Sequence, residues 1–301
     1  MRRALKFILA ALLAFTALAV IAIMVVSRTD FGRNRVRVYA LNALRNSVHG
    51  TVDVGRLDGN LLGDFSLTDV RISDPSGELF VSAERVEARV NATALFSKRV
   101  AISSLTLVRP VVHLSKRPNE GWNYETIFAS DSATPDSTLG WGDWVALRNV
   151  RLVDGTLRMQ RPWDTDSGVT GVERERAIAA ALSGATRTRI DRADNGLRQT
   201  IDFRSINGVL DRVIVADPAS RDIVLDVDSL AMIAAPFQPP SINVRQFSGE
   251  VRVGVDTVVA PRFVLRLPNT DIAGSFAYLL TNGDMFGTLR SDSLAFADLR
   301  S

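Results

Sequence analysis

The chain has no cysteine among its 301 residues and only two histidines, His49 and His113. Without cysteine it has neither a disulfide framework nor a thiolate that could act as a nucleophile or a metal ligand. The two histidines lie 64 positions apart, so they form no local zinc or haem ligand set. These absences exclude disulfide-stabilised folds and thiol chemistry, and they leave no His/Cys pattern typical of a metal site.

Motifs of common enzyme classes are missing as well. The sequence has no nucleophile elbow, no glycine-rich phosphate loop ending in Lys-Ser/Thr and no dinucleotide fingerprint, and it contains only three lysines. Asp222, Asp226 and Asp228 are the one acidic group that resembles a hard-cation site, but they alternate with aliphatic residues. That alternation is typical of a solvated strand face. We therefore expect no enzyme, no cofactor and no metal.

Positive charge is scarce outside the N-terminus, although the pI is 9.7. Residues 1–37 carry a net charge of +6, whereas residues 38–301 carry −3. A protein that binds nucleic acid needs its basic residues on the binding domain, where they neutralise phosphates. We therefore expect no nucleic-acid partner and assign the basic character to a membrane end.

One long hydrophobic run is present, and it predicts a transmembrane anchor within residues 1–28. Phe7 to Val26 is interrupted only by Thr16 and, as a helix, spans about 30 Å, the hydrocarbon thickness of a bilayer. The alternative is a cleaved signal peptide, but the run is longer than a usual signal core and no small-x-small site follows it. A single-pass anchor in the lipid bilayer is favoured. Basic residues flank both ends, so charge alone does not decide its orientation.

Residues 29–49 follow as a predicted amphipathic juxtamembrane helix. Val38, Leu41, Leu44 and Val48 recur at helical spacing, and arginines are available to the opposite side. One interpretation is a helix that closes one end of the following sheet or rests on anionic headgroups. The other is an ordinary first helix packed on that sheet.

From residue 52 onwards apolar residues alternate with other residues, and the alternation repeatedly skips one position. Phe65, Leu67, Val70 and Ile72 are an example. Alternation predicts a strand with one buried face, and an extra residue would turn later side chains to the opposite face unless a bulge absorbs it. We expect a bulge at each skip. Repeated bulges should curl the sheet into an elongated, twisted antiparallel β-groove, an open trough.

The turn residues and polar stretches divide this β region into parts. Residues 50–128 form an N-terminal β-groove segment in which we expect four or five strands up to residue 114 and a short helix over 119–129. Because no crossover helix separates most strands, antiparallel hairpins are favoured. A linker over 129–143 leads to residues 144–301, which continue the groove with a helical insertion over 171–193. The chain stops within an alternating stretch, so we expect a truncated chain or a groove that continues in a partner.

The N-terminal part resembles a known family. Residues 57–75, with the later strand 100–107 and the Gly-Trp-Asn of 121–123, resemble the N-terminal region of AsmA-like proteins, the TamB group in particular, over roughly residues 1–128. The resemblance implies a bacterial inner-membrane protein with a single span and its C-terminal part in the periplasm, involved in phospholipid movement and outer-membrane biogenesis. It implies no catalytic residues. This chain is shorter and lacks a recognisable C-terminal domain for docking to an outer-membrane barrel partner.

Two functions follow as expectations. In the first, the groove shields the acyl chains of phospholipids in transfer between the inner and outer membranes. In the second, the protein is a TamB-like scaffold or chaperone for outer-membrane protein assembly and secretion through exposed strand edges. The alternative for the apolar positions themselves is a closed sandwich core. The spacing leaves open whether residues before or after each skip face the groove. The predicted lipid-groove residues are Val52, Val54, Phe65, Leu67, Leu79, Val81, Val86, Val100, Ile102, Leu105, Val145, Leu147, Leu225, Val227, Ile242 and Val244.

Overall fold

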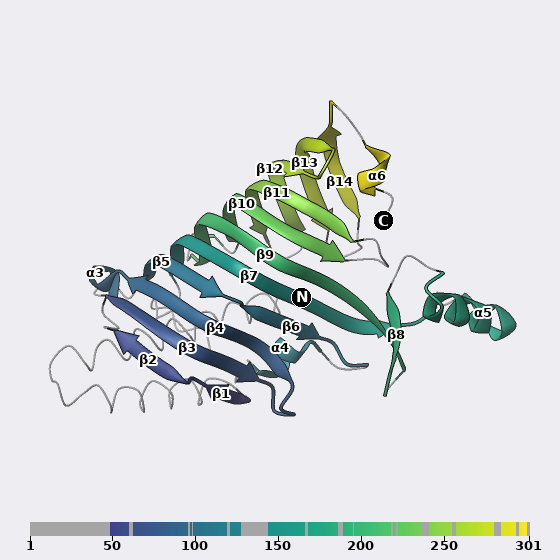
Figure 1. Ribbon diagram of the computed structural model, residues 1–301, viewed down its shortest axis with the longest axis horizontal. Helices are drawn as coiled ribbons and strands as arrows, with labels where there is room; N and C mark the ends of the chain where they lie inside the picture. The colour runs from purple at the N-terminus through teal and green to yellow at the C-terminus, as the bar shows by residue number, and fades with distance from the viewer. Residues whose placement is uncertain are drawn as a thin grey trace.

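The computed structural model describes the β region of the chain (Figure 1). The predicted membrane span, the predicted linker over 129–143 and all but the last residue of the helix predicted over 29–49 lie outside the described residues. Within the described part, no helix is both long and apolar enough to cross a membrane. The described residues are 49–59, 63–95, 97, 99–118, 121–127, 144–165, 168–185, 189–194, 196–217, 219–220, 222–235, 241–254, 257–279, 284–292 and 295–299.

The described part is mainly β, with 14 strands in one mixed, mostly antiparallel sheet and short helices beside it. The strands are β1 (Thr51–Asp53), β2 (Arg56–Gly59), β3 (Asp64–Ser73), β4 (Leu79–Val90), β5 (Val100–Val108), β6 (Val111–Ser115), β7 (Val145–Trp163), β8 (Ile190–Ala193), β9 (Gly196–Ala216), β10 (Ile223–Ala235), β11 (Ile242–Val253), β12 (Thr257–Arg266), β13 (Asp271–Leu279) and β14 (Met285–Arg290). The helices are α3 (Ala92–Leu95), α4 (Asn123–Ile127), α5 (Gly171–Leu182) and α6 (Phe296–Leu299).

Sequence neighbours are mostly sheet neighbours. The strand order is β1-β3-β4-β5-β7-β9-β10-β11-β12-β13-β14, while β2 pairs with β3, β6 with β4 and β7, and β8 with β9. Figure 1 shows these strands side by side in one twisted layer, from the N-terminal strands at one end to β14 at the other. Helix α5 projects beyond the end of the sheet next to β8.

One seam of the sheet is parallel, which corrects the expectation of a wholly antiparallel groove. Both β5 and β6 pair with β7 in parallel, for example Ile102 opposite Leu147 and Leu114 opposite Met159. The connection between β6 and β7 contains α4 and is long enough for the crossover that a parallel pair requires. Helix α4 also confirms the short helix expected within 119–129.

The N-terminal segment contains six strands, β1 to β6, instead of the four or five expected, because two long strands are each interrupted once. β5 and β6 are separated by Arg109, whose φ is +47°, and Pro110, which has no N–H to donate to a ladder. Strand β4 pairs with both pieces in one continuous antiparallel direction. Counted as continuous ribbons, the segment has the number of strands that the alternation indicates.

The skips in the alternation are positions where the backbone departs from a regular strand. Asn149 and Ser205, which lie within two of the skips, have φ of +48° and +50°. Register shifts accompany the skips of β5, β9, β10 and β11, which confirms bulges there. The skips of β3 and β4 lie opposite each other, with Leu67 opposite Val86 and Val70 opposite Ala83, so the register between these strands continues unshifted.

Left-handed residues line up across neighbouring strands. Asp69, Arg109, Asp154 and Ser205, which we call the crease, have φ between +47° and +53° and lie on β3, between β5 and β6, on β7 and on β9. Arg109 forms an ion pair with Glu84 of β4, and its N–H donates to the carbonyl of the residue before Asp154 at 2.8 Å. The N–H of Asp154 in turn donates to a side-chain amide of β9 at 2.9 Å. The irregularities therefore form one row.

The helix expected over 171–193 is shorter in the structure, which corrects that prediction. Helix α5 ends at Leu182, and Gly184 follows with φ of +76°, the left-handed conformation that ends many helices. The N–H of Ala185 donates to the carbonyl of Ala180 at 3.0 Å. Residues 190–193 form β8 instead, because they pair with β9 in an antiparallel hairpin.

Candidate functional site

The predicted groove residues lie on one apolar face of the sheet. Most belong to a buried core cluster that extends from β1 to β9, or pack against it. In the cluster are Val52, Phe65, Leu67, Val86, Val100, Ile102, Leu105, Val145 and Leu147, and Val54, Val81 and Leu225 pack against it. Val227 and Val244 are buried farther along the sheet, and Leu79 and Ile242 are half-buried. The structure thus brings these residues onto one surface.

The question of which residues face the apolar side has a definite answer. Ile102 and Leu105 are 5% and 4% exposed, although a skip separates them. Leu147 and Val150 are likewise buried on both sides of the skip in β7. Residues before and after each of these skips therefore share one face, since the irregular backbone turns the chain back to it.

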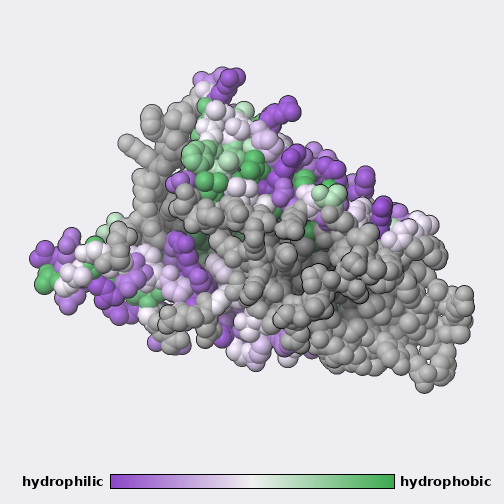
Figure 2. All heavy atoms as spheres, turned by 180° about the vertical axis from the view of Figure 1, so that it is seen from behind, coloured by the Kyte–Doolittle hydropathy of each residue, from purple (hydrophilic) through white to green (hydrophobic). Residues whose placement is uncertain are grey.

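The apolar face continues into the C-terminal strands, where it is more open. Directly opposed residues of paired strands lie on one face, and Phe247 of β11 opposes Leu265 of β12, which opposes Ile272 of β13. Phe247 also stacks on Phe263, with ring centroids 5.9 Å apart. Leu289 of β14 is in the same row and is 67% exposed. Figure 2 shows apolar side chains gathered over these C-terminal strands.

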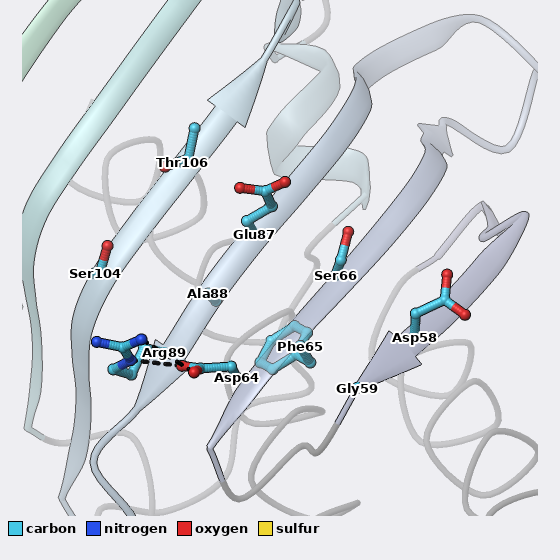
Figure 3. A pocket seen from close by; sticks show the side chains of 10 residues that line it. All are labelled: Asp58, Gly59, Asp64, Phe65, Ser66, Glu87, Ala88, Arg89, Ser104 and Thr106. Carbon is cyan, nitrogen blue, oxygen red and sulfur yellow. Dashed lines mark hydrogen bonds and ion pairs between the residues drawn. The ribbon is translucent and has the colours of Figure 1, made fainter.

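The opposite face of the sheet is polar. Figure 3 shows a hollow of about 420 Å³ on β2 to β5, where Ser66 opposes Glu87 and Glu87 opposes Thr106. Asp64 and Arg89 form an ion pair there with Nε and Oδ1 2.5 Å apart, and both side chains are exposed. The hydrogen bond from Arg89 lowers the pKa of Asp64 below its usual value. Cross-strand charge pairs of this kind keep the outer side of a sheet in water.

A second, larger hollow of about 890 Å³ borders β11 to β14. Ser248, Val264, Ala273 and Arg290 oppose one another in sequence across these four strands, so they share the face away from Phe247. It therefore lies mainly on the polar side. Its full lining is Ser248, Gly249, Pro261, Arg262, Phe263, Val264, Ala273, Gly274, Ser275, Thr288, Leu289 and Arg290.

A buried carboxylate lies on the polar side of β7 and β9. Asp202 is 1% exposed and accepts hydrogen bonds from Arg158 Nε at 2.8 Å and from Arg189 Nη1 at 3.0 Å. Burial alone raises the pKa of Asp202, but the hydrogen bond from Arg158 and the charges of Arg158, Arg189 and Arg204 outweigh it, so the pKa is lowered. Sequence reasoning missed this cluster because its partners come from different strands.

The aspartates considered as a cation site are not gathered into one. Asp226 accepts a hydrogen bond from Arg212 of the neighbouring strand at 2.6 Å, and Asp228 is exposed. Among the residues that the structure describes, no three His, Cys, Asp or Glu side chains are placed to hold a metal ion. The aspartates thus behave as a strand face that pairs with cations of the same sheet.

In comparisons with known proteins, no family model, no curated protein and no solved structure matches this chain. The likeness to AsmA-like proteins therefore rests on residues 57–75, 100–107 and 121–123. A functional conclusion has to come from the two faces of the sheet and from the edges of its strands.

Proposed function

We propose that the protein is a membrane-anchored periplasmic protein of the bacterial inner membrane whose sheet shields phospholipid acyl chains during transfer between inner and outer membranes. The observation that carries this proposal is the continuous apolar face from β1 to β14. All 14 described strands belong to a single sheet, so no second described sheet covers that face. A sandwich, the alternative for these positions, needs two facing sheets.

The free energy of moving a lipid through water explains why such a face is useful. An acyl chain of about sixteen carbons exposes methylene groups worth about 0.8 kcal/mol each, a barrier on the order of 10 kcal/mol. A continuous apolar surface removes most of this cost. Because each rung offers similar aliphatic side chains, no single position need retain the chain. Direction then has to come from a gradient or a partner.

The repeated irregularities support an open trough as the shape of this surface. Bulges bend strands and increase their twist, so a row of them curls a sheet about the side they close. With about 4.8 Å between strands, the path from β1 to β14 extends about 50 Å across the sheet. In this proposal the apolar residues of β1 to β9 form the closed part of the trough, and β11 to β14 form its open part.

Photocrosslinking in cells tests the proposal with a matched pair of neighbouring positions. Phe263 lies on the apolar face in contact with Phe247, whereas Val264 is 36% exposed on the other face. A benzoylphenylalanine at each position in turn, in the full chain, differs only in the face that it probes. We expect phospholipid adducts by mass spectrometry at position 263 and none at 264. Equal adducts at both positions, or none at either, would contradict the proposal.

A second candidate function, a scaffold or chaperone for outer-membrane proteins, is favoured by β14. Among the described strands β14 pairs only with β13, and all of its residues are exposed. Met285, Phe286 and Leu289 are 68%, 58% and 67% exposed. An exposed edge strand with apolar side chains can add an incoming strand. The same crosslinker at Phe286 tests this function, since protein adducts there would favour assembly.

A further inference from the structure

A small cavity on the polar side of the sheet contains buried polar atoms that the fold itself does not satisfy. The cavity, of about 210 Å³, lies between the end of β6 and the hairpin formed by β8 and β9. Ser115, Lys116 and Arg117 line it from β6 and the residues after it, Gln160 from β7, and Arg198 from β9. The proposed lipid surface is on the other face, with Leu114 and Met159.

Two atoms of this lining have no hydrogen-bond partner among the described residues. They are the hydroxyl oxygen of Ser115, which is 8% exposed as a residue, and Nε of Arg198. A buried polar atom without a partner costs about 1 to 3 kcal/mol, so native structures contain few of them. Both of these atoms belong to residues that line the same cavity. An acceptor bound in the cavity would satisfy both.

The surrounding contacts hold these groups in place. The backbone N–H of Ser115 donates to Oδ1 of Asn123 in α4 at 3.1 Å. The other end of the Arg198 guanidinium donates to Asp191 at 2.8 Å, which leaves Nε toward the interior. Gln160, which opposes Ser115, is already bonded to His113 at 2.8 Å and to Thr200 at 3.3 Å. Neighbouring side chains thus fix the lining without using the two free atoms.

The charges around the cavity favour an anion. Lys116, Arg117 and Arg198 line it together with Glu78 and Asp194, a net charge of +1. Glu78 faces Arg117 at 3.5 Å. The unsatisfied Nε is a donor that stays charged at all working pH values, and a serine hydroxyl can donate as well. An oxygen-rich anion that accepts from both is the complementary ligand.

We propose that this cavity binds a phosphate group, either as inorganic phosphate or as the phosphate of a lipid headgroup. A tetrahedral phosphate offers several acceptor oxygens, so it can accept from the Ser115 hydroxyl and from Arg198 Nε at once, with Lys116 adding charge. The volume of about 210 Å³ admits a phosphate with a small substituent. This site goes beyond acyl-chain shielding, since it lies on the opposite face and uses none of the groove residues.

The test is calorimetric titration of the full chain in a maltoside detergent and phosphate-free buffer. The two probes are inorganic phosphate and dihexanoylphosphatidylglycerol below its critical micelle concentration. We expect saturable binding of one or both, weakened at least tenfold by Ser115→Ala and by Arg198→Lys. Arg192→Lys is the matched control, because Arg192 is exposed on β8 and does not line the cavity. Its binding should equal that of the wild type.

Thermal unfolding keeps the result interpretable. Ser115→Ala removes only a buried hydroxyl without a partner, so in phosphate-free buffer its melting temperature should equal or exceed that of the wild type. Phosphate should raise the melting temperature of the wild type and not of this variant. Binding of inorganic phosphate alone would identify a free anion, and binding of the lipid would identify a headgroup. Absence of saturable binding, or unchanged binding in Ser115→Ala, would overturn the proposal, whatever the crosslinking at Phe263 shows.

Discussion

The strands β1 to β7 and the strands β11 to β14 carry the same alternation of apolar residues, yet their apolar faces differ in burial. Val100 and Leu147 in the first region are 0% and 2% exposed, whereas Met285 and Leu289 in the second are 68% and 67% exposed. Alternation therefore determines which residues share a face, and it does not determine whether that face is covered. Burial depends on what packs over the strand, which is a property of the whole fold.

Glycine placement is part of the difference. In the second region Gly249 opposes Phe263, and Gly274 opposes Phe263 and Leu289. A Cβ on Gly249, whose φ is +142°, would meet the carbonyl oxygen of Arg262 at 2.4 Å. Without side chains at these positions the apolar face is thinner, and large residues such as Phe263 cover the backbone beside them. The first region has aliphatic side chains in the corresponding row.

The largest expected effect separates the two regions by the same substitution. Leu147→Ala should lower the free energy of unfolding by about 3 kcal/mol, because it opens a cavity in a closed core. Leu289→Ala should cost less than about 0.5 kcal/mol, since this side chain is exposed. Urea unfolding of the full chain in detergent, followed by circular dichroism, measures both. Equal losses would mean that the C-terminal face is covered in solution and would end the comparison.

A smaller effect is expected on the polar face, where a buried pair can be compared with an exposed one. Asp202→Asn leaves Arg158 and Arg189 without their shared carboxylate and should cost about 2 kcal/mol. Asp64→Asn, in the exposed pair with Arg89, should change the free energy of unfolding by less than about 0.5 kcal/mol. Matching losses in the two variants would show that burial of Asp202 does not matter.

The pH dependence of Asp202 sharpens this test. Because its folded pKa is lowered, the ionised carboxylate adds stability that is present above its unfolded pKa of about 4 and is lost as the pH falls through the folded value. The difference between wild type and Asp202→Asn should therefore be constant near pH 7 and shrink below about pH 4. Denaturant unfolding at a series of pH values measures it, and a difference that grows in acid would contradict the assignment.

The smallest expected effect concerns backbone strain. In the first region the left-handed positions are occupied by residues such as Asn149 and Asp154, and the same holds for Ser205 on β9, while in the second region Gly249 has a positive φ. Ser205→Gly should raise the free energy of unfolding by about 0.5 kcal/mol, because glycine adopts positive φ without a steric penalty. Ser205→Ala should not raise it. If both variants behave alike, conformational strain at this position is not what the substitution relieves.

Much of the architecture was predictable because one-sided burial leaves a local record in the sequence. The alternation from Val52 onwards predicted the strands and the shared face, and the skips predicted backbone irregularities such as that at Ser205. The short helix α4 also followed from its segment. The parallel seam was missed, because the pairing of β5 with β7 depends on a crossover between distant residues. The helix over 171–193 was too long for the same reason, since residues 190–193 pair with β9.

The polar sites show where local reasoning ends. Arg158 and Asp202 are far apart in the sequence and become partners only because β7 and β9 pair in a particular register. Ser115 and Arg198 reach one cavity through three elements, and neither residue belongs to a recognisable motif. No spacing within a single strand encodes such a contact. The apolar face, by contrast, is written in every strand.

The crease limits how this architecture can lengthen during evolution. Each ribbon that crosses it changes direction at the same height, through Asp69, Arg109, Asp154 or Ser205. A duplicated hairpin could join the row only if it brought a left-handed or broken position of its own, because a straight ribbon would diverge from its neighbours at that line. Growth by whole hairpins that copy this kink is therefore easier than growth by single unmatched strands.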